Sequence, residues 1–258
     1  MRVIVTRPRA QAEALVRELQ GAGIDAVALP LIHIAPLSDA LPLQQAWAGL
    51  PQAALVVFVS ANAVLHFMCQ RPAHLAWPAH LLAGSTGPGT SAALRAAGVP
   101  APLLVEPAGK VFDSEALWRQ LQARDWRRRH VCVVRGEGGR DWLAERLAAA
   151  GAQVEFVTAY ERQLPRLDST GQALLDAASL QPRQHLWVFS SSQAVAHLGQ
   201  LAPHADWSAA GAVAPHARIV ERARQLGFGQ VGQAAVSAPA LAIAVAAAER
   251  RSIQSGAP

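Results

Sequence analysis

RVIVTRPRAQAEALVRELQGAGIDAVALPLI, residues 2–32 of this chain, aligns without a gap with HVCVVRGEGGRDWLAERLAAAGAQVEFVTAY, residues 130–160. Each copy begins with an apolar run, continues with leucines spaced along one helical face, and ends on a second apolar run. Gly23 and Gly151 occupy the same place in the two copies, where a helix would end. The repeat therefore predicts a strand, a helix and a strand in each copy.

The repetition extends beyond these two stretches. LVVFVSANAVLHF at residues 55–67 resembles LWVFSSSQAVAHL at 186–198, and GPGTSAALRAAGV at 87–99 has a weaker counterpart in APHARIVERARQLGF at 214–228. Both halves of the chain thus alternate strands with helices, which predicts parallel sheets covered by helices on both faces. The predicted fold class is α/β, with two similar doubly wound parallel-sheet domains.

Composition narrows the class of protein further. With 258 residues, 52% of them apolar, the chain can bury one large core or two ordinary ones. The two cysteines form neither a disulfide framework nor a C-x-x-C motif, which suits a reducing cytoplasm. The sequence opens without a signal-peptide pattern, and its longest apolar stretch is too short to span a bilayer. We therefore expect a cytoplasmic protein without a membrane partner.

The charge pattern does not indicate nucleic-acid binding. The net charge is +5, and nearly all basic residues are arginines. Arginine suits the bidentate binding of carboxylates or phosphates, although genomic base composition explains its abundance more simply. The basic cluster at residues 127–129 lacks the interleaved aromatic residues of a single-strand binding groove. The nine histidines show no metal-binding spacing, so we expect no metal.

The glycine-rich turn at residues 136–139 does not fit a nucleotide-binding fingerprint. Asp141 stands where the dinucleotide pattern needs its third glycine, and it also breaks the P-loop pattern. What remains is a strand, a tight turn and a helix N-terminus, which can attract an anion through unpaired N–H groups. The alternative is a turn that only needs the backbone freedom of glycine, and this stretch alone favours the alternative.

The carboxyl ends of the predicted strands are the expected place for a ligand. They carry hydroxyls, glycines and helix-start N–H groups, at residues 6–8, 60–62, 87–90, 135–138 and 190–192. Paired carboxylates, histidine clusters and cysteines are scarce there, which disfavours a hydrolase or a metalloenzyme. The set suits a cleft between two lobes that binds a large, negatively charged organic molecule.

Taken together, these segments resemble the uroporphyrinogen-III synthases of tetrapyrrole biosynthesis. The resemblance rests on VIVTRP, VFVSANAV, GPGTSAALRAAG, VRGEGGRDWLAERLAAAGA and VFSSSQAV, which keep the family's order over nearly the whole chain. It implies two α/β domains with interleaved connectivity, joined by a two-stranded linker. One domain would be residues 1–36 plus 165–258 and the other 37–164, whereas the repeat alone suggests a tandem with a boundary near residue 128.

The resemblance also implies a reaction. Hydroxymethylbilane, a linear polycarboxylated tetrapyrrole, loses its terminal hydroxyl as water and closes to uroporphyrinogen III with its last ring inverted. No cofactor is expected. Partners would be the substrate and, transiently, hydroxymethylbilane synthase, and the protein would be a monomer. The alternative is a non-catalytic two-lobed binding protein for a polycarboxylated ligand, against which the presence of Tyr160 argues.

Tyr160 is the only tyrosine of the chain and matches the family's catalytic tyrosine, which is thought to protonate the leaving hydroxyl. A tyrosine that packs at a domain junction is the alternative. The residues expected to bind substrate are Arg7, Ser60, Asn62, Thr90, Gly136, Ser190 and Ser191. For Asn62 and the hydroxyl-bearing residues, helix capping is the other possible role, and one residue can fill both.

Two questions remain open at the level of sequence. Arg7 and its repeat equivalent Arg135 could pair with substrate carboxylates or brace their own loops, with equal weight. Ala217 stands where the family often has a threonine, and alanine cannot donate a side-chain hydrogen bond. His216 or Arg218 could take over that contact.

Overall fold

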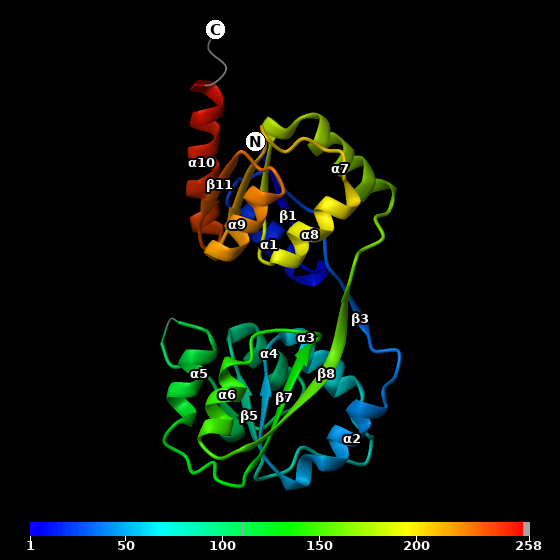
Figure 1. The fold of residues 1–258 in the computed structure, drawn as a ribbon, viewed down its shortest axis with the longest axis vertical. Coiled ribbons are helices and arrows are strands. Elements are labelled where there is room, and N and C mark those ends of the chain that lie inside the picture. The colour runs from blue at the N-terminus through cyan, green and yellow to red at the C-terminus, as the bar shows by residue number, and fades with distance from the viewer. Residues whose placement is uncertain (110, 255–258) are drawn as a thin grey trace. The chain divides into compact units, whose positions relative to one another are not determined.

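The computed structural model describes residues 1–109 and 111–254, which form two compact units (Figure 1). The first unit consists of Met1–His33 together with the chain from Gln163 onward, and the second unit is Ile34–Arg162. Each unit is built around one β-sheet. None of the helices in the described parts of the chain is both long and apolar enough to cross a membrane.

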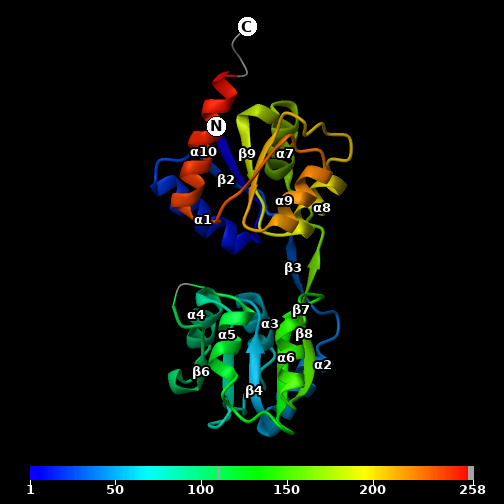
Figure 2. The same ribbon diagram turned by 60° about the vertical axis from the view of Figure 1, so that its left-hand side comes forward.

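The first unit has a five-stranded sheet of order β11-β10-β9-β1-β2, in which all neighbours are parallel (Figure 2). Its strands are β1 (Arg2–Val5), β2 (Ala26–Ala28), β9 (His185–Val188), β10 (Gly211–Ala214) and β11 (Gln230–Gln233). Its helices are α1 (Arg9–Gly21), α7 (Ser169–Leu180), η3 (Pro182–Gln184), α8 (Ser192–Leu201), α9 (Ala217–Gln225) and α10 (Ala238–Gln254). The N-terminal β1 therefore pairs with β9 from the far end of the chain.

The second unit has a six-stranded sheet of order β3-β8-β7-β4-β5-β6. Its strands are β3 (His33–Pro36), β4 (Ala53–Phe58), β5 (Leu82–Ser85), β6 (Leu104–Val105), β7 (His130–Gly136) and β8 (Gln153–Gln163). Its helices are α2 (Leu41–Gly49), η1 (Leu50–Gln52), α3 (Ala61–Cys69), α4 (Pro88–Ala96), η2 (Ala101–Leu103), α5 (Ser114–Leu121) and α6 (Trp142–Ala149). The neighbouring strands β3 and β8 carry the chain from the first unit to the second and back.

This topology confirms the interleaved, doubly wound α/β fold with a two-stranded linker. A plain tandem, which the repeat alone suggested, is wrong because β1 and β7 lie in different sheets and β1 joins the C-terminal strands instead. The order of strands in space depends on pairing between distant segments, and a local repeat carries no information about it.

The repeated stretches form β1-α1-β2 and β7-α6-β8, as their pattern predicts. Leu15 and Leu19 of α1 are buried, as are Leu143 and Leu147 of α6, which gives each helix one apolar face against its sheet. Both helices end before a glycine at the same repeat position, with left-handed φ angles of 78° and 94°. These glycines end the helices because other residues resist that conformation.

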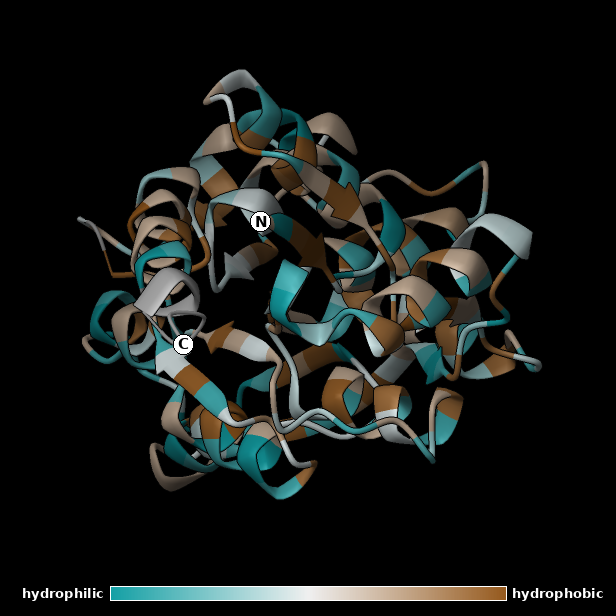
Figure 3. Ribbon diagram, turned by 90° about the horizontal axis from the view of Figure 1, so that it is seen from above, coloured by the Kyte–Doolittle hydropathy of each residue, from teal (hydrophilic) through white to brown (hydrophobic). Residues whose placement is uncertain are grey.

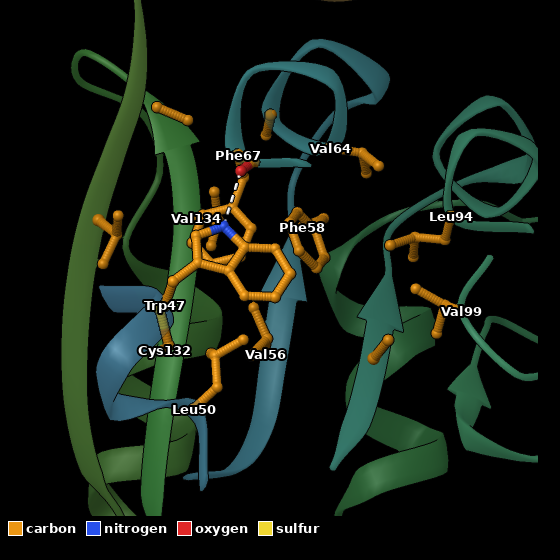
Figure 4. Close-up of a cluster of buried hydrophobic side chains, with 14 of the residues drawn as sticks. Trp47, Leu50, Val56, Phe58, Val64, Phe67, Leu94, Val99, Cys132 and Val134 are labelled. Carbon is orange, nitrogen blue, oxygen red and sulfur yellow. Dashed lines mark hydrogen bonds between the residues drawn. The ribbon is translucent and has the colours of Figure 1, made fainter. Parts of the chain in front are cut away.

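Alternation along β4 explains why helices cover both faces of the second sheet. Val56 and Phe58 point into a cluster with residues of α2, α3 and α4, whereas Leu55 and Val57 point into another with α5 and α6. In Figure 4 the first cluster surrounds Trp47, whose indole N–H donates to the Phe67 carbonyl at 2.8 Å. Figure 3 shows hydrophobic residues on many of the strands, while the helices mix both classes.

Candidate active site

Tyr160 lies near the carboxyl end of β8, with its side chain buried in the apolar cluster that also holds Phe58 and Trp47. Only 1% of the residue is exposed. Its phenol oxygen is 3.2 Å from the Ser60 hydroxyl oxygen, and Nη2 of Arg162 donates to it at 3.4 Å. A buried phenol with two polar partners is thus the centre of this site.

Gly136 makes room for the phenol ring. It is the last residue of β7 and pairs with Tyr160 across the β7–β8 ladder. A Cβ atom at this position would lie 2.6 Å from both Cε2 and Cζ of Tyr160, closer than van der Waals contact allows. Gly138 and Gly139, by contrast, adopt positive φ angles of 68° and 138° and serve the turn. The glycines of this turn therefore have two different physical roles.

Ser60 joins the helix N-terminus to the phenol. It lies just after β4 and caps α3, where its hydroxyl oxygen accepts the Ala63 N–H at 3.1 Å. The same oxygen contacts Tyr160, so capping and a site contact are combined in one residue. Ser60, Gly136 and Tyr160, which were predicted separately from three motifs, meet in space.

His66 was missed at the level of sequence. Its ring is tilted by 33° over the Tyr160 ring, with the centroids 5.6 Å apart. Burial lowers the pKa of His66 from its ordinary value of 6.5, because the charged imidazolium loses hydration. His66 therefore flanks the phenol as a neutral ring at neutral pH.

Arg162 was also missed, although the sequence carries a signal for it. Alternate residues of a strand point to the same face, so a residue two positions after Tyr160 on β8 lies beside it. The guanidinium carbon of Arg162 is 5.7 Å from the centroid of the phenol ring. A search for polar residues two positions from the tyrosine would have found it.

Asn62 and Thr90 lie at the starts of neighbouring helices of the second unit. Asn62 is half-buried in the first turn of α3, and Thr90 is buried in the first turn of α4, where its N–H bonds to the Gly87 carbonyl at 3.0 Å. Among the hydrogen bonds of the described residues, none joins either side chain to Tyr160. Their predicted contact with substrate stays a prediction.

A buried serine pair next to Thr90 was not predicted. The hydroxyl oxygens of Ser85 and Ser91 are 2.5 Å apart, and both residues are buried. A hydrogen bond from Ser91 and an ion pair with Arg95 lower the pKa of Glu106. This network fixes the start of α4 and thereby the position of Thr90.

The first unit holds Arg7, Ser190 and Ser191 at the equivalent edge of its own sheet. Ser191 caps α8 and accepts the Gln193 N–H at 3.1 Å, and Ser190 is half-buried beside it. Nε of Arg7 is buried and has no hydrogen-bond partner among the described residues. Burial lowers the pKa of Arg7, and the charge of Glu18 opposes this effect. An arginine in this state has unused capacity to bind an anion.

Arg135 differs from Arg7 although the two are repeat equivalents. Its guanidinium forms an ion pair with Asp141 and lies 3.8 Å from the centroid of the Phe156 ring. It therefore braces its own loop, which is one of the two roles that the sequence left open. Its partner Asp141 is the same residue that breaks both nucleotide fingerprints.

Ala217, which stands where the family often has a threonine, is the first residue of α9. His216 precedes α9 without a side-chain capping bond, and His216, Ala217 and Arg218 are all exposed. No group of three or more His, Cys, Asp or Glu side chains in the described ranges could hold a metal ion. The site thus offers hydroxyls, amides, arginines and one phenol.

Comparison with known proteins identifies the family that carries this site. A sequence model described as uroporphyrinogen-III synthase HemD matches residues 13–242.

The chain belongs to the uroporphyrinogen-III synthase family.

Relatives agree in sequence and in fold. The uroporphyrinogen-III synthase of Salmonella typhimurium strain LT2 is 31% identical over 176 residues, which cover 67% of this chain and 70% of that protein. The Escherichia coli K12 protein is 28% identical over 175 residues, with the same coverage of 67% and 70%.

Two solved structures share the fold. A mutant uroporphyrinogen III synthase of Thermus thermophilus superposes with a TM-score of 0.60 at 18% identity, covering 97% of this chain and 99% of that one. The Helicobacter pylori 26695 uroporphyrinogen-III synthetase gives a TM-score of 0.57 at 16% identity, covering 96% and 100%. At these identities the likeness concerns the fold alone. Family membership makes the chain a cyclising lyase of tetrapyrrole biosynthesis.

Proposed function

We propose that Tyr160 is the proton donor with which this chain, as a uroporphyrinogen-III synthase, closes hydroxymethylbilane to uroporphyrinogen III. The observation that supports this role is the pair of hydrogen bonds that hold its phenol oxygen at the carboxyl end of β8. A phenol carries an O–H that can be donated, so this group can serve as an acid. Hydroxide is a poor leaving group, and a positioned acid makes it leave as water.

The steps balance in atoms and protons. The phenol proton joins the departing hydroxyl to give water, and the bilane becomes a resonance-stabilised azafulvene cation. The last ring attacks through its substituted carbon, and the spiro intermediate reopens and recloses with that ring inverted. Loss of one proton from a ring carbon restores aromaticity and returns a proton to the phenolate. The net change is loss of one water molecule, with no cofactor.

Burial of Tyr160 sets a condition on this proposal. The phenol is 1% exposed, whereas Ser60 and Arg162, which contact its oxygen, are half-buried. Substrate can reach the phenol oxygen once these side chains shift enough to admit it beside them. Solvent stays excluded until then, which protects the site from unproductive proton exchange.

Substrate carboxylates are held, in this proposal, by hydroxyls, backbone amides and one arginine. The residues assigned to this role are Arg7, Ser60, Asn62, Thr90, Gly136, Ser190 and Ser191. Arg7 has the best support, because its buried Nε has no partner among the described residues. Gly136 has the weakest, because its contact with the Tyr160 ring already explains why it is glycine.

A coupled assay tests the function directly. Porphobilinogen and its deaminase supply hydroxymethylbilane, the products are oxidised, and isomers I and III are separated by chromatography. The chain should direct the product to isomer III, since spontaneous closure gives isomer I. A product that stays isomer I, although the bilane binds, would favour the non-catalytic binding protein, which the comparisons do not support.

We further propose that the protein acts in the cytoplasm as a monomer and meets hydroxymethylbilane synthase transiently. The support is chemical: the bilane closes spontaneously, so a short path between the two enzymes limits formation of isomer I. Light scattering of the purified protein tests the monomer. Cross-linking during turnover, with the synthase present, tests the contact.

A further inference from the structure

Arg162 and Tyr160 form a pair on one face of β8. Nη2 of Arg162 donates to the phenol oxygen at 3.4 Å, and the guanidinium carbon is 5.7 Å from the ring centroid. Arg162 is half-buried, which keeps its charge close to the phenol and only partly hydrated. The guanidinium thus lies at the edge of the phenol, beside the atom that would lose a proton.

Hydrogen-bond roles at the phenol oxygen follow from the chemistry of the partners. A guanidinium can only donate, so the phenol oxygen accepts from Arg162 and its own hydrogen points elsewhere. The hydroxyl oxygen of Ser60 already accepts the Ala63 N–H and still has a free lone pair. The phenol hydrogen is therefore directed toward Ser60 or toward a group that replaces it, such as a leaving hydroxyl.

We propose that Arg162 is a positioning residue that stabilises the Tyr160 phenolate formed when the proton leaves, an inference that rests on the proposed role of Tyr160. The resting contact of 3.4 Å is longer than the ~2.8 Å of a charge-assisted hydrogen bond. As negative charge develops on the phenol oxygen, this contact shortens and strengthens. Interactions that strengthen only in the transition state raise kcat rather than substrate affinity.

Ser60 assists in the same step by reversing its role. Either oxygen of the Ser60–Tyr160 pair can be the donor at 3.2 Å. While the phenol holds its proton, the Ser60 oxygen can accept a hydrogen bond from the phenol O–H. Once phenolate forms, the Ser60 hydroxyl can donate a hydrogen bond to it. The phenolate then receives one neutral hydrogen bond and one from a cation. The cation supplies the larger share, because charge-assisted bonds are about twice as strong.

A purely structural role for Arg162 makes different predictions. If Arg162 only packs its stem over the ring, Arg162→Met keeps most of that packing and most of the activity, and Arg162→Lys is no more active than Arg162→Met. If Arg162 stabilises phenolate, Arg162→Met loses most of the rate. Arg162→Lys, which retains a charge and a donor, then restores part of it.

The test compares these variants in the coupled assay, with Arg166→Met as a matched control. Arg166 is exposed and its replacement removes the same charge, so the control corrects for long-range attraction of an anionic substrate. We expect Arg162→Met to lower kcat by about 10- to 100-fold with a much smaller change in KM. Arg162→Lys should recover part of kcat, and Arg166→Met should resemble the parent.

The double variant Tyr160→Phe/Arg162→Met separates the two proposals. If Arg162 acts through Tyr160, methionine causes no further loss once the phenol is gone. Undiminished kcat in Arg162→Met, or an equal loss with and without Tyr160, overturns the inference on Arg162. Full activity of Tyr160→Phe alone overturns the proposed function instead. The lysine variant keeps the test decisive if the methionine variant is too unstable to assay.

Discussion

The two units carry the same local arrangement at the carboxyl ends of their central strands, but only one of them holds a phenol. Ser60 and Ser191 are equivalent in the repeat, and both cap the helix that follows. His66 and His197 are equivalent as well. The His66 ring lies tilted over the Tyr160 ring in the second unit, whereas Nδ1 of His197 is 2.6 Å from a backbone carbonyl in the first.

The difference lies in what each histidine faces. The repeat equivalent of Tyr160 is Ile32, and the equivalent of Gly136 is Pro8. The first unit therefore has neither a phenol nor the glycine that admits one, and its histidine bonds to the carbonyl next to Ile32. The repeated arrangement thus keeps its capping pattern in both units, while the phenol occurs in one.

The arginines show the opposite division. Arg135 of the second unit is occupied by Asp141, whereas Nε of Arg7 in the first unit lacks a partner within the described ranges. We interpret this as a division between the units, in which the second holds the proposed proton donor and the first holds the arginine with spare capacity for an anion. Five experiments can break or sharpen this interpretation.

The largest expected difference between the units is in autonomous folding. The second domain, proposed as residues 37–164, is continuous, so this fragment alone should unfold cooperatively in denaturant. Residues 1–128 should not, because the cut removes β9 from beside β1 and removes β7 from beside β4. Circular dichroism with urea titration measures both. A cooperative transition in 1–128 would contradict the interleaved domain boundaries.

Tyr160→Phe should abolish most of the activity. It keeps the ring and its packing but deletes the proton, so isomer III formation should fall by ~10²–10⁴-fold while the melting temperature changes little. Isomer I should then appear by spontaneous closure. Ile32→Val, at the equivalent position of the first unit, is the control and should leave the isomer ratio unchanged. A folded phenylalanine variant with undiminished turnover would remove Tyr160 from the mechanism.

Gly136→Ala should destabilise the second unit. The new Cβ would lie 2.6 Å from the Tyr160 ring, so the ring or the strand must shift, at a cost of about 1–3 kcal/mol in the free energy of unfolding. Gly89→Ala is the control, since no heavy atom lies within 4 Å of its added Cβ. Denaturant unfolding of both variants measures the difference, and equal stabilities would refute the close approach of the ring.

Arg7→Met should weaken substrate binding by about tenfold, the effect of losing one hydrogen bond to a charged group. Its stability should stay equal or rise, because an incompletely partnered, desolvated charge is removed. Arg135→Met should leave KM unchanged and lower the free energy of unfolding by at most about 1 kcal/mol, since its partner Asp141 is half exposed. Steady-state kinetics and thermal unfolding of both variants check this, and identical KM values would end the distinction between the two arginines.

The smallest effect concerns pH and His66. Burial lowers the pKa of His66 below 6.5, so on acidification the unfolded chain takes up this proton before the folded one does. The contribution of His66 to the free energy of unfolding is therefore fully present above pH 6.5, and it is lost as the pH falls through the lowered pKa. His66→Gln should show a smaller drop in melting temperature between about pH 7 and pH 5 than the parent. An equal drop in melting temperature in the variant and the parent would exclude His66 as a source of acid sensitivity.

Much of the site could be read from local pattern. The repeat located the strand ends, and with the family resemblance it pointed to Ser60, Gly136 and Tyr160 as separate candidates. Capping by Ser60 and Ser191 followed from small polar residues ahead of apolar helices. His66 was missed because a histidine in a helix gives no sign of the ring that it will contact in another element. Arg162 was missed although its position two residues after Tyr160 on a strand was a usable signal.

The sequence by itself determined the strands, the helices and their caps, because periodicity, capping and glycine conformations act over a few residues. Only the tertiary structure decided that β1 pairs with β9, that Gly136 admits a phenol ring, that Arg135 pairs with Asp141 and that Nε of Arg7 has no partner among the described residues. These contacts join segments far apart in the chain or select one of several nearby charges. They depend on which side chains the packed sheets bring within hydrogen-bonding distance, and no spacing along the chain encodes that.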